Sequence, residues 1–466
     1  MKNAICDNKK RFISAACKLL VCSFFFCAQA QESVALHDDQ VTKSKASTKA
    51  WTLLTYIQAD NSLAEFASYN MTAMQKGMLD DTNVNMLVQW DQPGNNKTWR
   101  YRIVRGGKIE DDSLSLEMGT NPSQEIVDSM QWAVSKYPAS HYGLILWNHG
   151  SGIEDYCRSR LSVLLQKHIH SWIELPGLPH KNLSEITDGQ RGILYDDSQN
   201  TCLTNQGLSS AMSAIKTMLG KKIDLIGMDA CLMAMVEVCY QVRQFADVFV
   251  GSQQTEPGEG WNYRSFLAAL TAKPSLGSLG LATSIVQAYK EFYKYHPDAR
   301  DFTLSAVRMD SIDELKSNID DIAKGIISCV SCDAQTMTSI LSKARKASIE
   351  MYSPEYIDLH SFCTALLNQL QRTAPKSAKF LQNNRPLSKP MTPEFQQAAN
   401  KLTACLTTAM KTISKAVIMN VCGPALANVK GLSIYYPSKG SIDSSYAKTL
   451  FAQDSSWMTF LKSLRA

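Results

Sequence analysis

A thiol and an imidazole occupy equivalent places in this sequence, each just beyond the end of a short apolar run. The run IDLIGM leads into Asp229-Ala230-Cys231, and the run GLILWN leads into His149-Gly150. The carboxyl ends of parallel strands meet at one edge of a sheet, which is where ligands bind in open α/β folds. The spacing after Cys231 is helical, and a cysteine at a helix N-terminus beside an imidazole has its thiolate favoured. Such a pair supplies a nucleophile and a general acid or base.

Gly150 adds a third feature to this candidate site. Because glycine has no Cβ, its backbone can lie close to a substrate carbonyl, and its N–H together with that of Cys231 could hold an oxyanion. Taken singly, a buried cysteine after a strand is more often a packing residue, and a His-Gly pair is more often a turn. Their joint placement at two strand ends favours catalysis.

The segments that must position these residues alternate between strand-like and helical patterns. Apolar runs begin at residues 51, 83, 143, 223 and 247, and helical spacing covers 121–137, 205–219 and 231–245. This alternation predicts an α/β fold with a mostly parallel sheet flanked by helices. We therefore separate a catalytic domain, 51–270, from a largely helical C-terminal region, 271–466. Within the latter we expect a strand near 431–437 to return to the main sheet.

The first thirty residues have the features of a secretory signal peptide. Five basic residues precede or flank the start of the apolar run LLVCSFFFC, and Ala28-Gln29-Ala30 fits a small-x-small cleavage site, so we predict cleavage after Ala30. No later apolar run is long enough to span a bilayer. Residues 31–50 have the composition of a flexible leader. The sequence thus predicts a secreted or periplasmic protein without a stable membrane anchor after signal removal.

The charge and the cysteine content limit the classes of function that this sequence can have. The formal net charge is +5, but most of it lies in the signal segment, so nothing electrostatic predicts nucleic-acid binding. Nine of the cysteines lie beyond that segment. An odd number leaves at least one thiol unpaired if the others bridge, and that thiol is a candidate nucleophile. The alternative, that most are small buried hydrophobic residues, fits the count equally well.

Six ordered blocks resemble the clostripain family of secreted cysteine peptidases. They are WTLLTYIQADNSL, GLILWNHGSG, RGILYDDSQNTCLT, IDLIGMDACLMAMVEV, GSQQTEPGEGWNY and GLSIYYPS, and they run from about residue 51 to 437. The resemblance implies a caspase-like fold and a catalytic dyad, with His149 and Cys231 matching the family's positions. Family members cleave peptides and proteins after basic residues.

The same resemblance implies how a basic side chain is selected. Asp229 matches the residue at the base of the family's specificity pocket, and a carboxylate in a partly desolvated pocket does select Arg or Lys. Glu259 stands where relatives carry Asp at the pocket entrance, so it would add a second negative charge. The alternative for Glu259 is a solvated loop carboxylate.

Residues 153–191 form a polar insertion between the two dyad strands, where relatives commonly cleave themselves. This predicts a zymogen that is activated by cleavage after Arg158 or Arg160. The alternative is an uncut surface loop whose basic and acidic residues balance.

The sequence requires no cofactor. Cys329 and Cys332 form a CxxC without zinc spacing, for which a local disulfide or two packed thiols is the better interpretation, and we assign no metal ligand. Asp91 and the pair Asp196-Asp197 could bind calcium, which some relatives require, although paired loop carboxylates are usually solvated.

The sequence therefore predicts a thiol protease, a secreted cysteine endopeptidase cleaving after Arg or Lys through His149 and Cys231. Two alternatives are a catalytically silent caspase-like binding module and an amidase that uses the same dyad on a non-protein substrate.

Overall fold

A computed structural model describes residues 48–155, 192–296, 299–373, 392–438 and 440–464. These residues belong to one compact unit that begins at Thr48. The expected signal peptide, its cleavage site after Ala30 and nearly all of the leader lie outside the described residues. So does most of the expected insertion, including Arg158 and Arg160.

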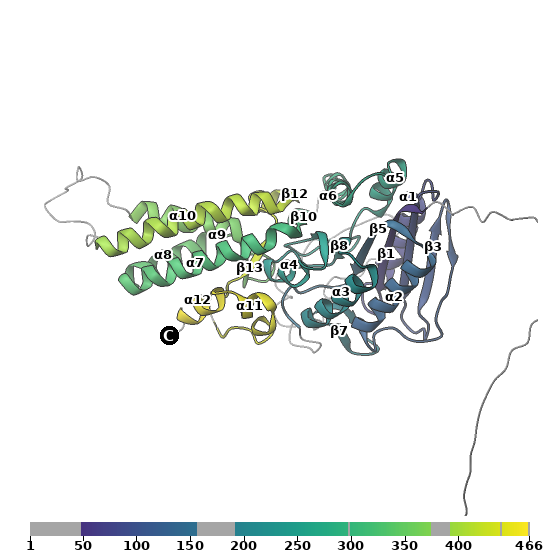
Figure 1. The fold of residues 1–466 in the computed structure, drawn as a ribbon, viewed down its shortest axis with the longest axis horizontal. Coiled ribbons are helices and arrows are strands. Elements are labelled where there is room, and N and C mark those ends of the chain that lie inside the picture. The colour runs from purple at the N-terminus through teal and green to yellow at the C-terminus, as the bar shows by residue number, and fades with distance from the viewer. Residues whose placement is uncertain (1–47, 156–191, 297–298, 374–391, 439, 465–466) are drawn as a thin grey trace, which may run out of the picture. The chain divides into compact units, whose positions relative to one another are not determined.

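In the described part of the chain, the main sheet has nine strands in the order β12-β10-β9-β8-β5-β1-β2-β3-β4 (Figure 1). Their bounds are β1 (Lys49–Gln58), β2 (Val84–Asp91), β3 (Trp99–Val104), β4 (Gly107–Glu110), β5 (Ala139–Trp147), β8 (Ile223–Asp229), β9 (Ala246–Gly251), β10 (Thr303–Arg308) and β12 (Val417–Cys422). The five central strands, from β9 to β2, are parallel, and antiparallel pairs extend both edges. The mostly parallel α/β fold predicted from the sequence is confirmed.

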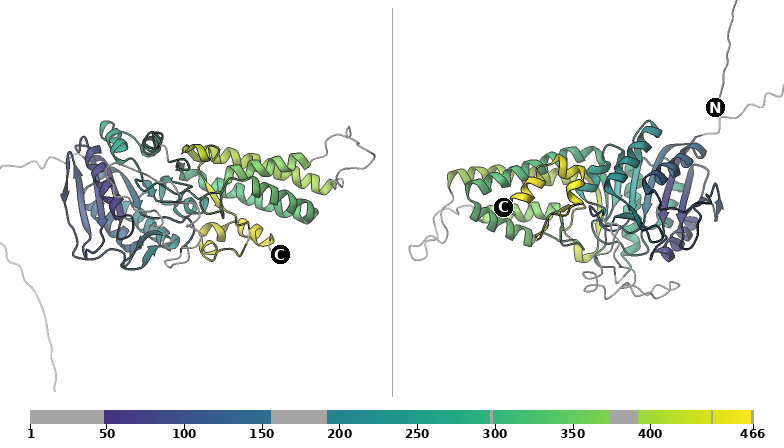
Figure 2. Two further views of the ribbon diagram at one scale, coloured as in Figure 1. Left: turned by 180° about the vertical axis from the view of Figure 1, so that it is seen from behind. Right: turned by 90° about the horizontal axis from the view of Figure 1, so that it is seen from below.

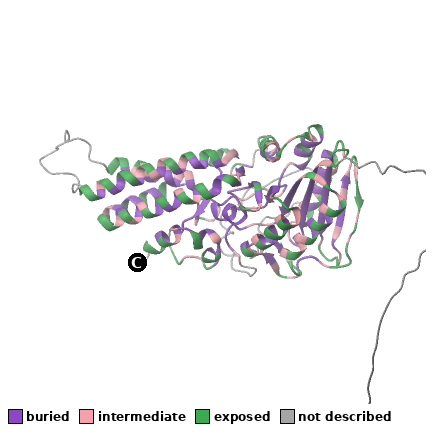
Figure 3. Ribbon diagram, in the orientation of Figure 1, coloured by how far each residue is buried: buried purple, intermediate pink, exposed green. Residues whose placement is uncertain are grey.

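Helices cover both faces of this sheet because alternate side chains of its strands face two hydrophobic layers. In β1, Leu54 and Tyr56 belong to one layer, and Leu53 and Ile57 belong to the other. The first layer is covered by α2 (Pro122–Lys136), α3 (Asn205–Leu219) and α4 (Val236–Val242), and the second by α1 (Ala64–Gly77), α5 (Tyr263–Ala272) and α6 (Ser278–Tyr293). Figure 3 shows that the central strands are mostly buried and that the longer helices have one buried and one exposed side.

Local sequence signals set the ends of these helices. The Asn121 side chain accepts a hydrogen bond from Gln124 N, and Pro122 occupies the first turn of α2. Thr204 caps α3 through a bond from Gly207 N, and Gly220 ends that helix in the left-handed conformation. These are the residue types that favour helix starts and stops.

The C-terminal region is mostly helical. Beyond α6, its α-helices are α7 (Ile312–Cys332), α8 (Ala334–Ala347), α9 (Leu359–Thr373), α10 (Pro393–Ala416), α11 (Leu450–Asp454) and α12 (Trp457–Ser463). Figures 1 and 2 show α7 to α10 lying alongside one another, with α12 next to α7. β10 and β12 from this region complete one edge of the main sheet.

The strand expected near 431–437 exists but does not return to the main sheet. β13 (Ser433–Tyr435) pairs with β11 (Tyr356–Asp358) in a separate two-stranded sheet. The edge beside β10 is already taken by β12, and Tyr435 N donates instead to the buried Glu237 Oε1 at 2.9 Å. A further hairpin joins β6 (Ile193–Asp196) and β7 (Thr201–Leu203).

Strand register aligns the carboxyl ends of the central strands. Ile57 of β1 lies opposite Trp147 of β5, which lies opposite Asp229 of β8. The chain adds strands in opposite directions from β1, toward β2 and toward β5, so this edge is a topological switch point where ligands bind in such folds.

Candidate active site

The register places His149 and Cys231 at the same level beyond two neighbouring strands. Each residue stands two positions after a paired strand end, Trp147 for the histidine and Asp229 for the cysteine. Asn148 N donates to Asp229 O at 3.3 Å, which extends the strand pairing into the site. The fold therefore brings the two predicted dyad residues to one edge of the sheet.

His149 is held by its neighbours in the β1 and β5 loops. Its Nε2 lies 3.0 Å from Ser62 Oγ, and its backbone N–H donates to the side-chain oxygen of Asn148. The Asn148 amide in turn donates to Tyr195 O at 2.9 Å. Burial lowers the pKa of His149 to about 4, so the imidazole is neutral at pH 7.

Cys231 is half-buried, and its sulfur accepts a hydrogen bond from Glu256 N at 3.3 Å. Burial raises the pKa of the thiol to about 11; the Glu256 N–H opposes this rise and the Asp229 charge adds to it. In the described part of the chain no hydrogen bond joins Cys231 to His149. The resting pair therefore consists of a thiol and a neutral imidazole.

The expectation that a helix begins at Cys231 is wrong. α4 begins at Val236, and Leu232 has φ 65°, a left-handed conformation that a right-handed helix cannot contain. Leu232 N and Ala234 N donate to Gln254 O and Ser252 O, so the segment after the cysteine follows the loop after β9. No helix dipole acts on the thiol, which explains why its pKa rises where a helix N-terminus would lower it.

Gly150 lies against the cysteine loop. A Cβ at this position would come within 2.5 Å of Cys231 O and 3.0 Å of Met233 Sδ. The two loops can approach this closely only because residue 150 has no side chain.

Asp229 is buried directly before the cysteine loop. Its carboxylate accepts hydrogen bonds from Tyr263 Oη at 2.8 Å and from Trp261 N at 3.3 Å. Burial raises the pKa of Asp229 to about 7, although these donors and Glu256 lower it.

Glu259 is 1% exposed, so the solvated alternative considered for it does not hold. Neither of its oxygens has a hydrogen-bond partner in the described part of the chain, and burial raises its pKa. Tyr293, whose hydroxyl donates to Gly260 O at 2.9 Å, has its pKa raised by burial and then by Glu259, Glu256 and Asp229.

Glu256 is a site residue that the sequence reasoning missed. Both of its carboxyl oxygens are buried, and among the described residues neither has a hydrogen-bond donor. Burial, followed by the charges of Asp229 and Cys231, raises the pKa of Glu256 well above the usual range, so its carboxyl group holds a proton. The signal that could have identified Glu256 in the sequence was its position after β9, the next parallel strand. We call Asp229, Glu256 and Glu259 the thiol-side carboxylates.

The clostripain family model matches residues 55–170 and 178–463. The chain belongs to the clostripain family. Clostripain from Hathewaya histolytica is 26% identical over 257 residues, which are 48% of this chain and 43% of clostripain, so the match spans less than half of that relative.

Two solved structures share the fold. A secreted C11 cysteine protease from Bacteroides thetaiotaomicron, solved with an irreversible peptide inhibitor, is 22% identical with a TM-score of 0.57, and the alignment covers 88% of this chain and 99% of that one. An inactive zymogen C11 protease from Parabacteroides distasonis is 18% identical with a TM-score of 0.53, over 88% and 98% of the two chains. The resemblance to the clostripain family and its caspase-like fold is thereby confirmed.

Most cysteines in the described residues of this clostripain-family chain are unpaired. Cys202 is disulfide-bonded. The other described cysteines are free, and they are Cys231, Cys239, Cys329, Cys332, Cys363, Cys405 and Cys422. Several free thiols are buried, as the hydrophobic alternative predicts. The CxxC pair is two thiols without a disulfide.

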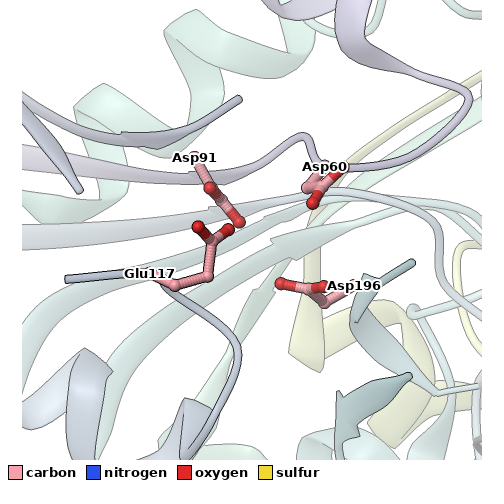
Figure 4. Close-up of side chains that lie close together, drawn as sticks. All are labelled: Asp60, Asp91, Glu117 and Asp196. Carbon is pink, nitrogen blue, oxygen red and sulfur yellow. The ribbon is translucent and has the colours of Figure 1, made fainter. Parts of the chain in front are cut away.

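The fold separates the three carboxylates that the sequence analysis gave as possible calcium ligands. Asp91 and Asp196 come together with Asp60 and Glu117 (Figure 4), whereas Asp197 is exposed and lies outside this group. We call Asp60, Asp91, Glu117 and Asp196 the four-carboxylate cluster. In the described residues no helix is long and apolar enough to cross a membrane.

Proposed function

We propose that this protein is a secreted cysteine endopeptidase that cleaves after Arg or Lys with His149 and Cys231 as its dyad. The observation that carries the proposal is their placement beyond paired strand ends with buried carboxylates beside the thiol. The thiol has a base on the neighbouring loop, and a cation bound beside it would meet buried carboxyl groups.

The chemistry begins from the neutral pair. His149 Nε2 leaves the Ser62 hydroxyl and takes the thiol proton as Cys231 Sγ bonds to the peptide carbonyl carbon. The carbonyl π electrons move to oxygen, and the N–H groups of Gly150 and Cys231 hold that oxyanion. The imidazolium then protonates the departing amine, leaving an acyl-enzyme. Water, deprotonated by His149, releases the acid and restores the thiol.

Specificity follows from the thiol-side carboxylates. Asp229 is the group that pairs with the guanidinium or ammonium of the substrate, and Glu256 releases its proton when that cation arrives, because a nearby positive charge favours the ionised carboxyl. Glu259, whose oxygens have no hydrogen-bond partner among the described residues, adds a further carboxyl group. A planar guanidinium can bond two carboxylate oxygens at once, which favours Arg.

The proposal also includes secretion and activation by self-cleavage. Residues 1–30 direct export, and the similarity in fold to a secreted protease and to an inactive zymogen supports both export and a precursor form. Self-cleavage after Arg158 or Arg160 produces a fragment beginning at Ser159 or Leu161, and N-terminal sequencing of the mature protein tests this.

The experiment compares the purified protein with Cys231→Ala on matched peptides that end in Arg, Lys, Asp or Leu before a reporter, under reducing conditions. Cys332→Ser is the matched control, because that thiol is exposed and free. We expect cleavage after Arg and Lys by the wild type and by Cys332→Ser only. If no peptide is cleaved, even after trypsin nicking between 156 and 191, a binding module replaces the peptidase.

A further inference from the structure

A loop of the C-terminal region contacts the segments that follow both dyad residues. It joins α8 to β11, contains Tyr352 and ends at Tyr356, the first residue of β11. Tyr352 N donates to Gln254 Oε1 at 2.7 Å, and Gln254 O accepts a hydrogen bond from Leu232 N at 3.1 Å. Burial, followed by the charge of Cys231, raises the pKa of Tyr352 to about 12. The loop is therefore linked to the residue directly after the thiol.

Tyr356 makes the contact on the histidine side. Its hydroxyl donates to Ser151 O at 2.7 Å, and both residues are buried. A second donor to this carbonyl, Glu154 N, lies at 3.5 Å, which is long for a hydrogen bond. Because a buried carbonyl needs a donor, the phenol hydroxyl holds Ser151 in place. Ser151 stands two positions after His149, so this bond fixes the turn that follows the imidazole.

The turn that Tyr356 contacts is tightly packed. Gly152 has φ 69°, a left-handed conformation that favours glycine, and a Cβ there would come within 3.0 Å of Tyr356 Cε2. A Cβ on Gly150, two residues earlier, would come within 2.5 Å of Cys231 O. The tyrosine ring therefore lies against one side of the turn and the cysteine loop against the other. A displacement of the turn would change how Gly150 faces Cys231.

We propose that Tyr356 is a positioning residue for the reaction at His149 and Cys231. Its hydroxyl sets the turn that carries the Gly150 N–H, one of the two oxyanion donors of the mechanism given above. Such donors stabilise the transition state only when they are held at hydrogen-bond distance from the oxygen that becomes charged. This inference rests on the proposed function and deepens it, because it gives the C-terminal region a part in the catalytic geometry.

Tyr435 offers a matched control within the same two-stranded sheet. It pairs with Tyr356, is fully buried as well, and its hydroxyl accepts a hydrogen bond from Asp443 N at 2.8 Å instead of contacting a dyad loop. Tyr356→Phe and Tyr435→Phe each remove one buried hydroxyl and keep the ring. Both variants should therefore lower the melting temperature by a few degrees, and only Tyr356→Phe should affect catalysis.

The first experiment measures cleavage of an Arg peptide by the wild type and both variants. We expect Tyr356→Phe to lower kcat about tenfold with little change in KM, and Tyr435→Phe to leave both unchanged. A peptide aldehyde ending in Arg adds the Cys231 thiol to its carbonyl, which places an oxygen at the oxyanion position. Its affinity should fall by a similar factor in Tyr356→Phe, whereas benzamidine should bind equally. Equal kcat in the wild type and Tyr356→Phe, or equal losses in both variants, overturns the proposal.

The second experiment does not depend on peptidase activity. It compares amide hydrogen exchange in the full-length Cys231→Ala protein with and without Tyr356→Phe. Exchange should become several-fold faster in peptides covering 149–154 and stay the same in those covering 254–256, because the turn opens locally when its carbonyl loses a donor. If the wild type cleaves no peptide, the proposed function fails, and faster exchange in 149–154 still supports the hold of Tyr356 on the turn. Unchanged exchange there overturns the inference whatever the activity.

Discussion

The two groups of acidic side chains at the sheet edge differ in what surrounds them. The thiol-side carboxylates lie among aromatic residues, where Tyr263 donates its hydroxyl to Asp229 and Tyr293 lies near all three acids. The four-carboxylate cluster has oxygen atoms from four backbone segments within 4.8 Å of one another.

This difference shows how one sheet edge gives two groups of acidic side chains different surroundings. An organic cation brings methylene groups that need apolar walls, and it forms directional hydrogen bonds with one or two carboxylates. A metal ion brings only charge and is satisfied by several oxygens at short range. The kinds of residue around each group of carboxylates therefore distinguish the two groups better than their acidity does.

The largest effect is expected from Asp229→Asn. Removing one partner of a buried charge pair costs about 3–5 kcal/mol, or roughly a hundredfold to several thousandfold in kcat/KM for an Arg peptide. Asp60→Asn serves as the matched control, and it should retain the preference for Arg over Leu. Equal loss of that preference in both variants would remove the distinction between the two groups.

A smaller effect is expected from pH. The pKa of Asp229 is raised to about 7, so the carboxyl is neutral below that pH and charged above it. Affinity for benzamidine, measured by calorimetry with the Cys231→Ala protein, should fall by up to about tenfold for each unit below pH 7. Neutral benzamide should show no such trend, and Asp229→Asn should flatten the curve. A flat curve with Asp229 present would contradict the role given to this residue.

The substitution Glu256→Gln tests the role of Glu256, the site residue that the sequence reasoning missed. Its backbone N–H, which donates to the thiol, remains in place, so only the carboxyl is removed. We expect kcat/KM for Arg peptides to fall about tenfold while the rate of alkylation of Cys231 by iodoacetamide stays the same.

The smallest effect concerns Glu237, a buried acid in neither group. Burial raises its pKa to about 7, and in the described residues its Oε2 has no hydrogen-bond partner. Because the folded state holds a proton that the unfolded state releases between about pH 4.5 and 7, this residue lowers stability as pH rises through that window. Glu237→Gln should raise the melting temperature by a few degrees at pH 8 and little at pH 5. An equal change at both pH values would point to packing instead of ionisation.

The sequence predicted the strands that carry the dyad because buried parallel strands are nearly continuous apolar runs. GLILWN and IDLIGM end at the residues that the structure places beyond β5 and β8. The helix start was missed because helical spacing does not reveal that Leu232 adopts a left-handed conformation.

Convergence of distant segments was the other feature beyond the reach of the sequence. Asp91 and Asp196 were visible as loop carboxylates, but Asp60 and Glu117 join them only through the sheet order and the path from β4 to α2. Glu256 was overlooked for the same reason, since its proximity to Asp229 depends on β9 lying beside β8.

The pairing of β5 with β8 has a consequence for the integrity of the molecule. These strands are neighbours from Gly143↔Leu225 to Trp147↔Asp229, yet the chain between them includes residues 156–191. A single backbone cut in that interval would leave two polypeptides joined along the middle of a continuous sheet, with hydrophobic layers on both sides of the seam. Such a protein would run as two bands on a denaturing gel under reducing conditions and elute as one particle from a sizing column.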